Sequence, residues 1–185
     1  MKKFLLMVAV MMSAMSMSAQ NDVGQISVAP VVGLNFAKMT FDDAKFITGM
    51  QIGAVAEYGL LEKLGLSAGL VYSMQGTKTK EPGETVKLKA NYLNVPVLAN
   101  YYVIPGLAVK AGLQPGFLLS AKMDGENVKD ELKSFDLSIP VGVSYEYQNF
   151  VVDARYNLGV TKVSKEGDSA KNQVVQLTLA YKFKL

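Results

Sequence analysis

Six charged residues in this chain have the types and the spacing to act together. They are three acids and three bases, all within strand-like segments: Glu57, Lys110, Glu146, Asp153, Arg155 and Lys182. Gathered in a confined space, such a set could conduct ions or relay protons. It could also form a closed cluster of ion pairs, because an unpaired buried charge is very costly. We favour the paired, structural cluster.

Two missing residue types exclude most other chemistry. The sequence contains no histidine and no cysteine. Nucleophilic catalysis of the Ser-His-Asp or Cys-His kind needs an imidazole base, and thiolate or imidazole metal sites need the same side chains. We therefore expect no enzyme activity, no metal or other cofactor and no disulfide bond.

The first twenty residues have the organisation of a secretory signal peptide. Lys2 and Lys3 precede an apolar run at residues 4–12, and small residues follow at 16–20. We expect cleavage between Ser18 and Gln20, which leaves residues 21–185 as one mature domain. The net charge of +3 is spread along the chain. It does not indicate nucleic-acid binding, which would need a concentrated basic patch.

Apolar and polar residues alternate through the rest of the chain. In residues 172–185, apolar side chains occupy every second position from Val175 to Leu185, and the positions between them are mostly polar. Because successive side chains of a strand point to opposite faces, such a segment has one apolar and one polar face. Eight segments show this pattern: 26–36, 50–58, 64–75, 87–103, 107–121, 135–147, 150–160 and 172–185.

The connections and the charges indicate how these strands are arranged. Long, mostly charged connections alternate with short turns, as in outer-membrane barrels. The apolar faces carry essentially no charge, whereas the polar faces carry glycines, serines and the six charged residues. Eight strands enclose only enough room for packed side chains. We predict an all-β fold, an eight-stranded antiparallel up-and-down transmembrane β-barrel with its apolar face toward lipid and both termini in the periplasm.

Aromatic residues are expected at one level of this barrel. With periplasmic termini, seven would face lipid near the periplasmic ends of their strands, where amphipathic rings favour the interface. We predict that they form a periplasmic aromatic girdle: Tyr58, Tyr101, Tyr145, Tyr147, Phe150, Tyr181 and Phe183.

Residues 91–102, NYLNVPVLANYY, resemble the PorT-like outer-membrane β-barrel family, in which a tyrosine-leucine-x-apolar-proline strand precedes a tyrosine pair. The resemblance continues in order through residues 111–122, 134–147, 153–163 and 171–183. It implies an eight-stranded barrel of the Gram-negative outer membrane that is inserted by the barrel-assembly machinery. For the founding member it also implies a part in assembling the type IX secretion system. The chain departs from the family by ending two residues past Phe183.

The function we expect is that of a small integral outer-membrane protein with a side-chain-filled lumen. Its role would be structural, or an interaction made through charged outer loops or the periplasmic rim. Its partners would be outer-membrane lipid, the barrel-assembly machinery during insertion, and an envelope or secretion protein. Three alternatives are open: a narrow porin-like channel, an accessory of type IX secretion, and a soluble lipocalin-like binder with an apolar interior.

Overall fold

A computed structural model describes residues 23–40, 44–81, 84–164 and 170–185. The predicted signal peptide lies outside the described residues. No helix in these ranges combines the length and the apolar character needed to cross a membrane. The described chain is almost entirely strand, with one short 3-10 helix, η1, at Lys129–Glu131.

The strands follow one another around a single wall. Their bounds are β1 Ile26–Met39, β2 Ile47–Leu61, β3 Leu64–Glu81, β4 Glu84–Asn94, β5 Val97–Ile104, β6 Leu107–Met123, β7 Glu126–Asn127, β8 Phe135–Tyr147, β9 Phe150–Gly159, β10 Asn172–Tyr181 and β11 Phe183–Lys184. β4 and β5 occupy one place in the wall, as do β10 and β11, and β7 only extends the edge of β6. The wall therefore has eight strands, as predicted.

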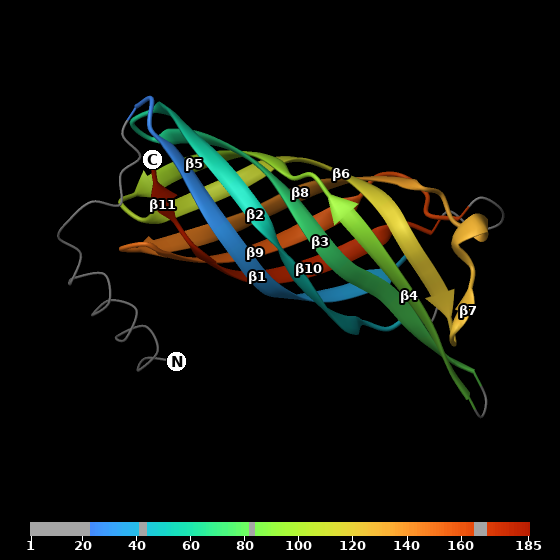
Figure 1. Cartoon of the computed structure of the whole chain (residues 1–185). Coiled ribbons are helices and arrows are strands. Elements are labelled where there is room, and N and C mark those ends of the chain that lie inside the picture. Colours follow the sequence, from blue (N-terminus) through green and yellow to red (C-terminus); the bar gives the residue numbers. More distant parts are fainter. Residues whose placement is uncertain (1–22, 41–43, 82–83, 165–169) are drawn as a thin grey trace, which may run out of the picture.

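The first and last strands close the barrel. β1 pairs antiparallel with β10 from Val31↔Ala180 to Met39↔Asn172, and with β11 at Ser27↔Lys184. Every other neighbouring pair is also antiparallel. Figure 1 shows the resulting elongated cylinder, with the C-terminus at one of its ends. The predicted closed antiparallel barrel is confirmed.

The two ends of the cylinder differ in their connections. One end, here called the turn end, holds the two-residue turns after β2, β5 and β8 together with the start of β1 and the end of β11. The opposite end, the loop end, holds the β1–β2, β3–β4, β6–β8 and β9–β10 connections. The predicted alternation of long and short connections is confirmed for β1–β2, β6–β8 and β9–β10, whereas only residues 82–83 separate β3 from β4.

The outer surface of the barrel is apolar and the middle of its lumen is polar. Ile52 and Leu70 are 61% and 59% exposed, whereas Asn35 and Asn100 are 0% exposed. A soluble barrel would show the opposite arrangement, with an apolar interior and a wet exterior. The exposed apolar belt therefore contradicts the lipocalin-like alternative.

Near the loop end the structure differs from the prediction in two ways. The sequence predicted a loop at residues 77–86, but β3 continues to Glu81 and β4 begins at Glu84. The lumen is also not polar throughout, because an apolar cluster fills it here: Met39, Leu88, Ala90, Tyr92, Leu118, Ala121, Leu132, Val163 and Ala170. The many charged residues of 77–86 indicate a loop, but the β-branched Thr77, Thr79 and Val86 suit strands.

The break between β4 and β5 has a local cause. Pro96 has no N–H to donate to a ladder. Its carbonyl still accepts from Gly69 N at 3.1 Å, and Val95 N donates to the carbonyl of Pro115 at 2.8 Å. The wall thus stays closed across the proline, which causes only a short interruption of one strand.

Candidate functional site in the lumen

Lys182 lies between two glutamates near the turn end. Its Nζ is 2.7 Å from Glu146 Oε2 and 3.6 Å from Glu57 Oε2. All three residues are buried. Tyr102 completes this group, since its hydroxyl donates to Glu57 Oε1 at 2.7 Å and accepts from Lys182 Nζ at 3.3 Å. The four side chains come from strands β2, β5, β8 and the link between β10 and β11, so they join widely separated parts of the wall.

Asp153 is the centre of a second ionic group, deeper in the barrel. Its Oδ2 is 2.9 Å from Lys110 Nζ, and its Oδ1 accepts from Arg155 Nε at 2.6 Å. Asp153 and Arg155 are both buried on β9, and Lys110 approaches from β6. The two groups contain all six of the charged residues singled out in the sequence.

The two groups balance each other in charge. Lys182 with Glu57 and Glu146 carries one net negative charge, and Asp153 with Lys110 and Arg155 carries one net positive charge. Because ion pairs in a low-dielectric interior must offset a large desolvation cost, this neutrality favours a closed, stable cluster.

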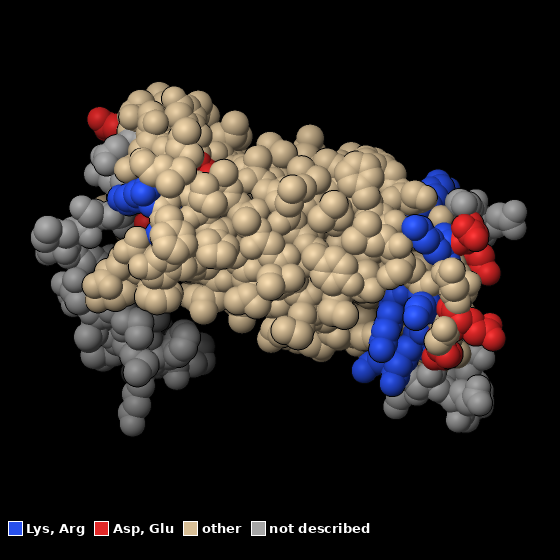
Figure 2. All heavy atoms as spheres, in the orientation of Figure 1, with Lys and Arg blue, Asp and Glu red and all other residues tan. Residues whose placement is uncertain are grey.

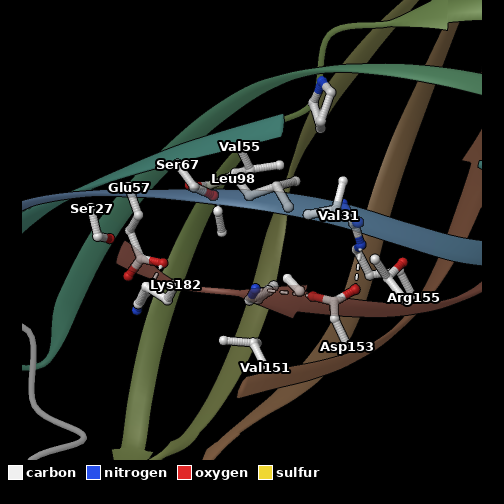
Figure 3. A pocket seen from close by; sticks show the side chains of 15 residues that line it. Ser27, Val31, Val55, Glu57, Ser67, Leu98, Val151, Asp153, Arg155 and Lys182 are labelled. Carbon is white, nitrogen blue, oxygen red and sulfur yellow. Dashed lines mark hydrogen bonds and ion pairs between the residues drawn. The ribbon is translucent and has the colours of Figure 1, made fainter. Parts of the chain in front are cut away.

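A small cavity lies between the two ionic groups. Figure 3 shows Glu57 and Lys182 on one side of it and Asp153 and Arg155 on the other, with Val151 and Leu98 between them. The volume is about 50 Å³. That is room for a few water molecules and not for a larger solute. Val31, Val151 and Ala180 belong to an apolar cluster and line this cavity beside the charged residues.

Amide and hydroxyl side chains fill the next layer toward the loop end. Gln51 Nε2 donates to Thr178 Oγ1 at 2.7 Å, and Asn35 Nδ2 donates to Ser73 Oγ at 2.9 Å. The first hydrogen bond joins β2 to β10, the two strands that flank β1, and the second joins β1 to β3 across β2. Side chains that bond between non-neighbouring strands therefore fill this layer of the lumen.

Sequence reasoning missed two members of the lumen network. The first is Tyr102, which bonds to both Glu57 and Lys182. Asp136, beyond the amide layer, accepts from Thr161 Oγ1 at 2.8 Å and from Asn172 Nδ2 at 3.3 Å. Among the described residues no cation pairs with Asp136. Alternation could have placed both side chains inside, but it could not have shown their partners.

The seven aromatic residues of the predicted girdle all lie near the turn end. Six are exposed on the outer face and Tyr145 is half-buried. Phe150 and Tyr181 stack edge to face with ring centroids 5.1 Å apart, and Tyr181 and Phe183 have centroids 4.8 Å apart. Their level relative to a bilayer stays a prediction.

None of the described residues forms a group of three or more His, Cys, Asp or Glu side chains that could hold a metal ion. The ionic groups consist of pairs whose carboxylates are already occupied by lysine and arginine. The site is built for mutual neutralisation of charge within the barrel.

Comparison with known proteins assigns the family. Residues 18–165 match the model of the outer membrane protein beta-barrel domain. The chain belongs to the outer-membrane β-barrel protein family. Membership of this family indicates an outer-membrane location. No curated protein matches the chain.

Several solved outer-membrane barrels have the same fold. Ail, the attachment invasion locus protein of Yersinia pestis, was solved with the heparin analogue sucrose octasulfate; it has a TM-score of 0.58 and 18% identity over 88% of this chain and 100% of that one. Neisserial surface protein A gives 0.56 and 18% over 85% and 97%. OprG of Pseudomonas aeruginosa gives 0.53 and 13% over 90% and 98%. At these identities the likeness shows the fold alone.

Proposed function

We propose that this protein is a small, closed outer-membrane barrel that acts as a structural or interaction protein and not as a pore. The observation that carries the proposal is the pair of ionic groups, which close the lumen with six charged side chains and leave a cavity of about 50 Å³. The sequence contains no histidine, and the described residues form no group that could hold a metal ion, so neither feature supports an enzymatic role.

The lumen cluster supports a structural role because its members bond across the barrel. Each ionic contact joins two strands that are separated by one intervening strand, apart from the contact between Arg155 and Asp153, which are both on β9. Such contacts fix the positions of the strands relative to one another and so stabilise the shape of the barrel. Interaction with partners is then left to the loop end and the turn end, where the connections are.

The test is conductance of the purified protein in planar bilayers. We expect the wild-type barrel to give no stable single-channel current, and Arg155→Ala to lower the temperature at which the folded gel mobility is lost without opening a current. A steady current in the wild type, or a large new current in Arg155→Ala, would sink the closed-barrel proposal in favour of the narrow porin-like channel.

We further propose that the termini and the turn end face the periplasm, and that the aromatic girdle lies at that interface. The short turns at this end support the orientation, since outer-membrane barrels have short periplasmic turns. Insertion by the barrel-assembly machinery belongs to the same proposal.

A PorT-like role in type IX secretion rests only on the sequence resemblance of residues 91–102 and the segments that follow. It predicts co-purification with secretion components from detergent-solubilised outer membrane, and loss of secretion on deletion. Secretion at the wild-type level in a deletion strain would exclude it.

A further inference from the structure

The outer face of the barrel changes character near the loop end, on strands β3, β4 and β6. Along β4 the outward positions pass from Leu93 through Asn91 to Lys89 and Lys87, and the inward neighbours Leu88 and Ala90 are buried. At about 3.3 Å per residue, the step from Leu93 to Lys89 covers about 13 Å along the strand. The outer face of β4 therefore changes from apolar to basic within about 13 Å along the strand.

Five lysines are brought together on this outer face by strand pairing. They are Lys45, Lys78, Lys87, Lys89 and Lys122, here called the lysine patch. Paired residues of an antiparallel sheet point to the same face. The pairs Lys45↔Lys78 and Lys78↔Lys87 form one row, and Lys89↔Lys122 forms the next. Figure 2 shows basic side chains gathered at this end of the molecule, with acidic side chains beside them.

The lysine patch is not neutralised by acidic side chains of the described structure. Like charges placed directly opposite each other destabilise a sheet. Among the described residues, none of the five lysines forms an ion pair. Two nearby acids do not neutralise them: Asp124 Oδ1 accepts from the backbone N of Lys87 at 3.0 Å, and Glu126 pairs with Met123, which puts it on the opposite face from Lys122.

The hydrogen bond between Asn91 Nδ2 and Ser120 Oγ, 3.0 Å long, marks the border below the patch. On the far side of that border lie Leu93 and Phe117, which are paired on the outer face, and Phe117 is 47% exposed. A ligand of the patch would thus be anionic on the loop-end side of the border and apolar on the belt side. A phosphorylated membrane lipid has this division, since its phosphate lies directly above its acyl chains.

We propose that the lysine patch binds the phosphate groups of anionic lipid headgroups in the leaflet that surrounds the loop end. The lysine stems lie along the sheet and their ammonium groups reach the phosphates, as long cationic side chains do at membrane interfaces. The cost of placing like charges opposite each other is offset only when the lipid is present. This inference goes beyond the closed-barrel proposal and does not depend on which end faces the periplasm.

The test uses the full mature chain in nanodiscs that contain equal amounts of phosphatidylglycerol and phosphatidylcholine. Native mass spectrometry gives the ratio of the two lipids retained by the protein. We expect the wild type to retain phosphatidylglycerol preferentially, and K87Q/K89Q/K122Q to lower that preference by about fivefold or more, with screening by salt limiting the effect. K87R/K89R/K122R should keep the preference.

The matched control is K129Q/K133Q/K162Q, which removes the same charge from exposed lysines at the same end but outside the lysine patch. Gel mobility before heating shows that each variant folds. Equal losses in the patch and control variants, or an unchanged ratio in the patch variant, would overturn the proposal. It would also be overturned if the wild type showed no lipid preference but bound inorganic pyrophosphate in detergent through the patch, because the ligand would then be a soluble polyanion.

Discussion

At the residue scale, Lys182 has the most demanding position in the molecule. It is one buried cation shared by two buried carboxylates and one tyrosine hydroxyl. Removing it leaves Glu57 and Glu146 near each other with the compensating charge gone. The loss in the free energy of unfolding is larger than the contribution of any single contact, because two uncompensated charges stay in a low-dielectric lumen.

We expect Lys182→Met to destabilise the barrel by about 3–5 kcal/mol, the range for breaking a buried ion pair by removing one partner. The measurement is the free energy of unfolding in urea, in lipid vesicles. Lys184→Met is the control, since Lys184 is exposed two residues away. Equal unfolding free energies for the two variants would show that the ionic group contributes nothing to stability.

At the element scale, the extended β3–β4 hairpin depends on one glycine. Gly76 has a φ of +143°, a conformation that side chains rarely adopt, and a Cβ there would collide with the carbonyl oxygen of Leu88 on β4. The backbones of the two strands therefore approach closely at the level of the lysine patch. This close approach holds Lys78, Lys87 and Lys89 in one surface.

Gly76→Ala should loosen this hairpin and cost about 1–3 kcal/mol, the range for a strained backbone position. Limited trypsin digestion of the barrel in vesicles, read by peptide mass, should show new cleavage after Lys78 and Lys87. Gly125→Ala is the control that distinguishes backbone strain from a steric clash. Gly125 also has a positive φ, +102°, but a Cβ there would meet nothing within 4 Å. Cleavage as slow as in the wild type would contradict the close-approach argument.

The alternation of residues predicted the strands because it depends on local geometry alone. It placed Glu57, Lys110 and Lys182 on the inner face, and it placed Leu177 and Leu179 on the outer one. It did not predict that β3 continues to Glu81 and that β4 begins at Glu84, because the charged residues there indicated a loop. Alternation with a period of two residues identifies the two faces of a strand. It does not identify the level at which the surrounding medium changes from lipid to water.

The partners within the lumen could not be predicted for a different reason. Glu57 and Lys182 are far apart in sequence, and their contact depends on the stagger of all the strands around the barrel. Each bulge changes that stagger, as at Asn91/Tyr92 and Tyr102/Ile104. Sequence reasoning therefore named the six charged residues without dividing them into two groups.

At the scale of the whole molecule, the absence of cysteine makes the orientation directly measurable. We expect Lys133→Cys, at the loop end, to react with a membrane-impermeant maleimide in intact cells. Lys184→Cys, at the turn end, should react only after the outer membrane is permeabilised. Both residues are exposed, so both should react in detergent. Labelling of Lys184→Cys alone in intact cells would reverse the proposed orientation.

The lysine patch also opposes re-orientation of the barrel after it has inserted into the membrane. A lysine at the bilayer midplane costs about 2–4 kcal/mol, and the cost falls to about 0–1 kcal/mol near the interface. Lys45, Lys78, Lys87, Lys89 and Lys122 all cross the hydrocarbon when the loop end does. Once across, the folded barrel would have to carry these charges back to turn over, so its orientation is retained for as long as it stays folded.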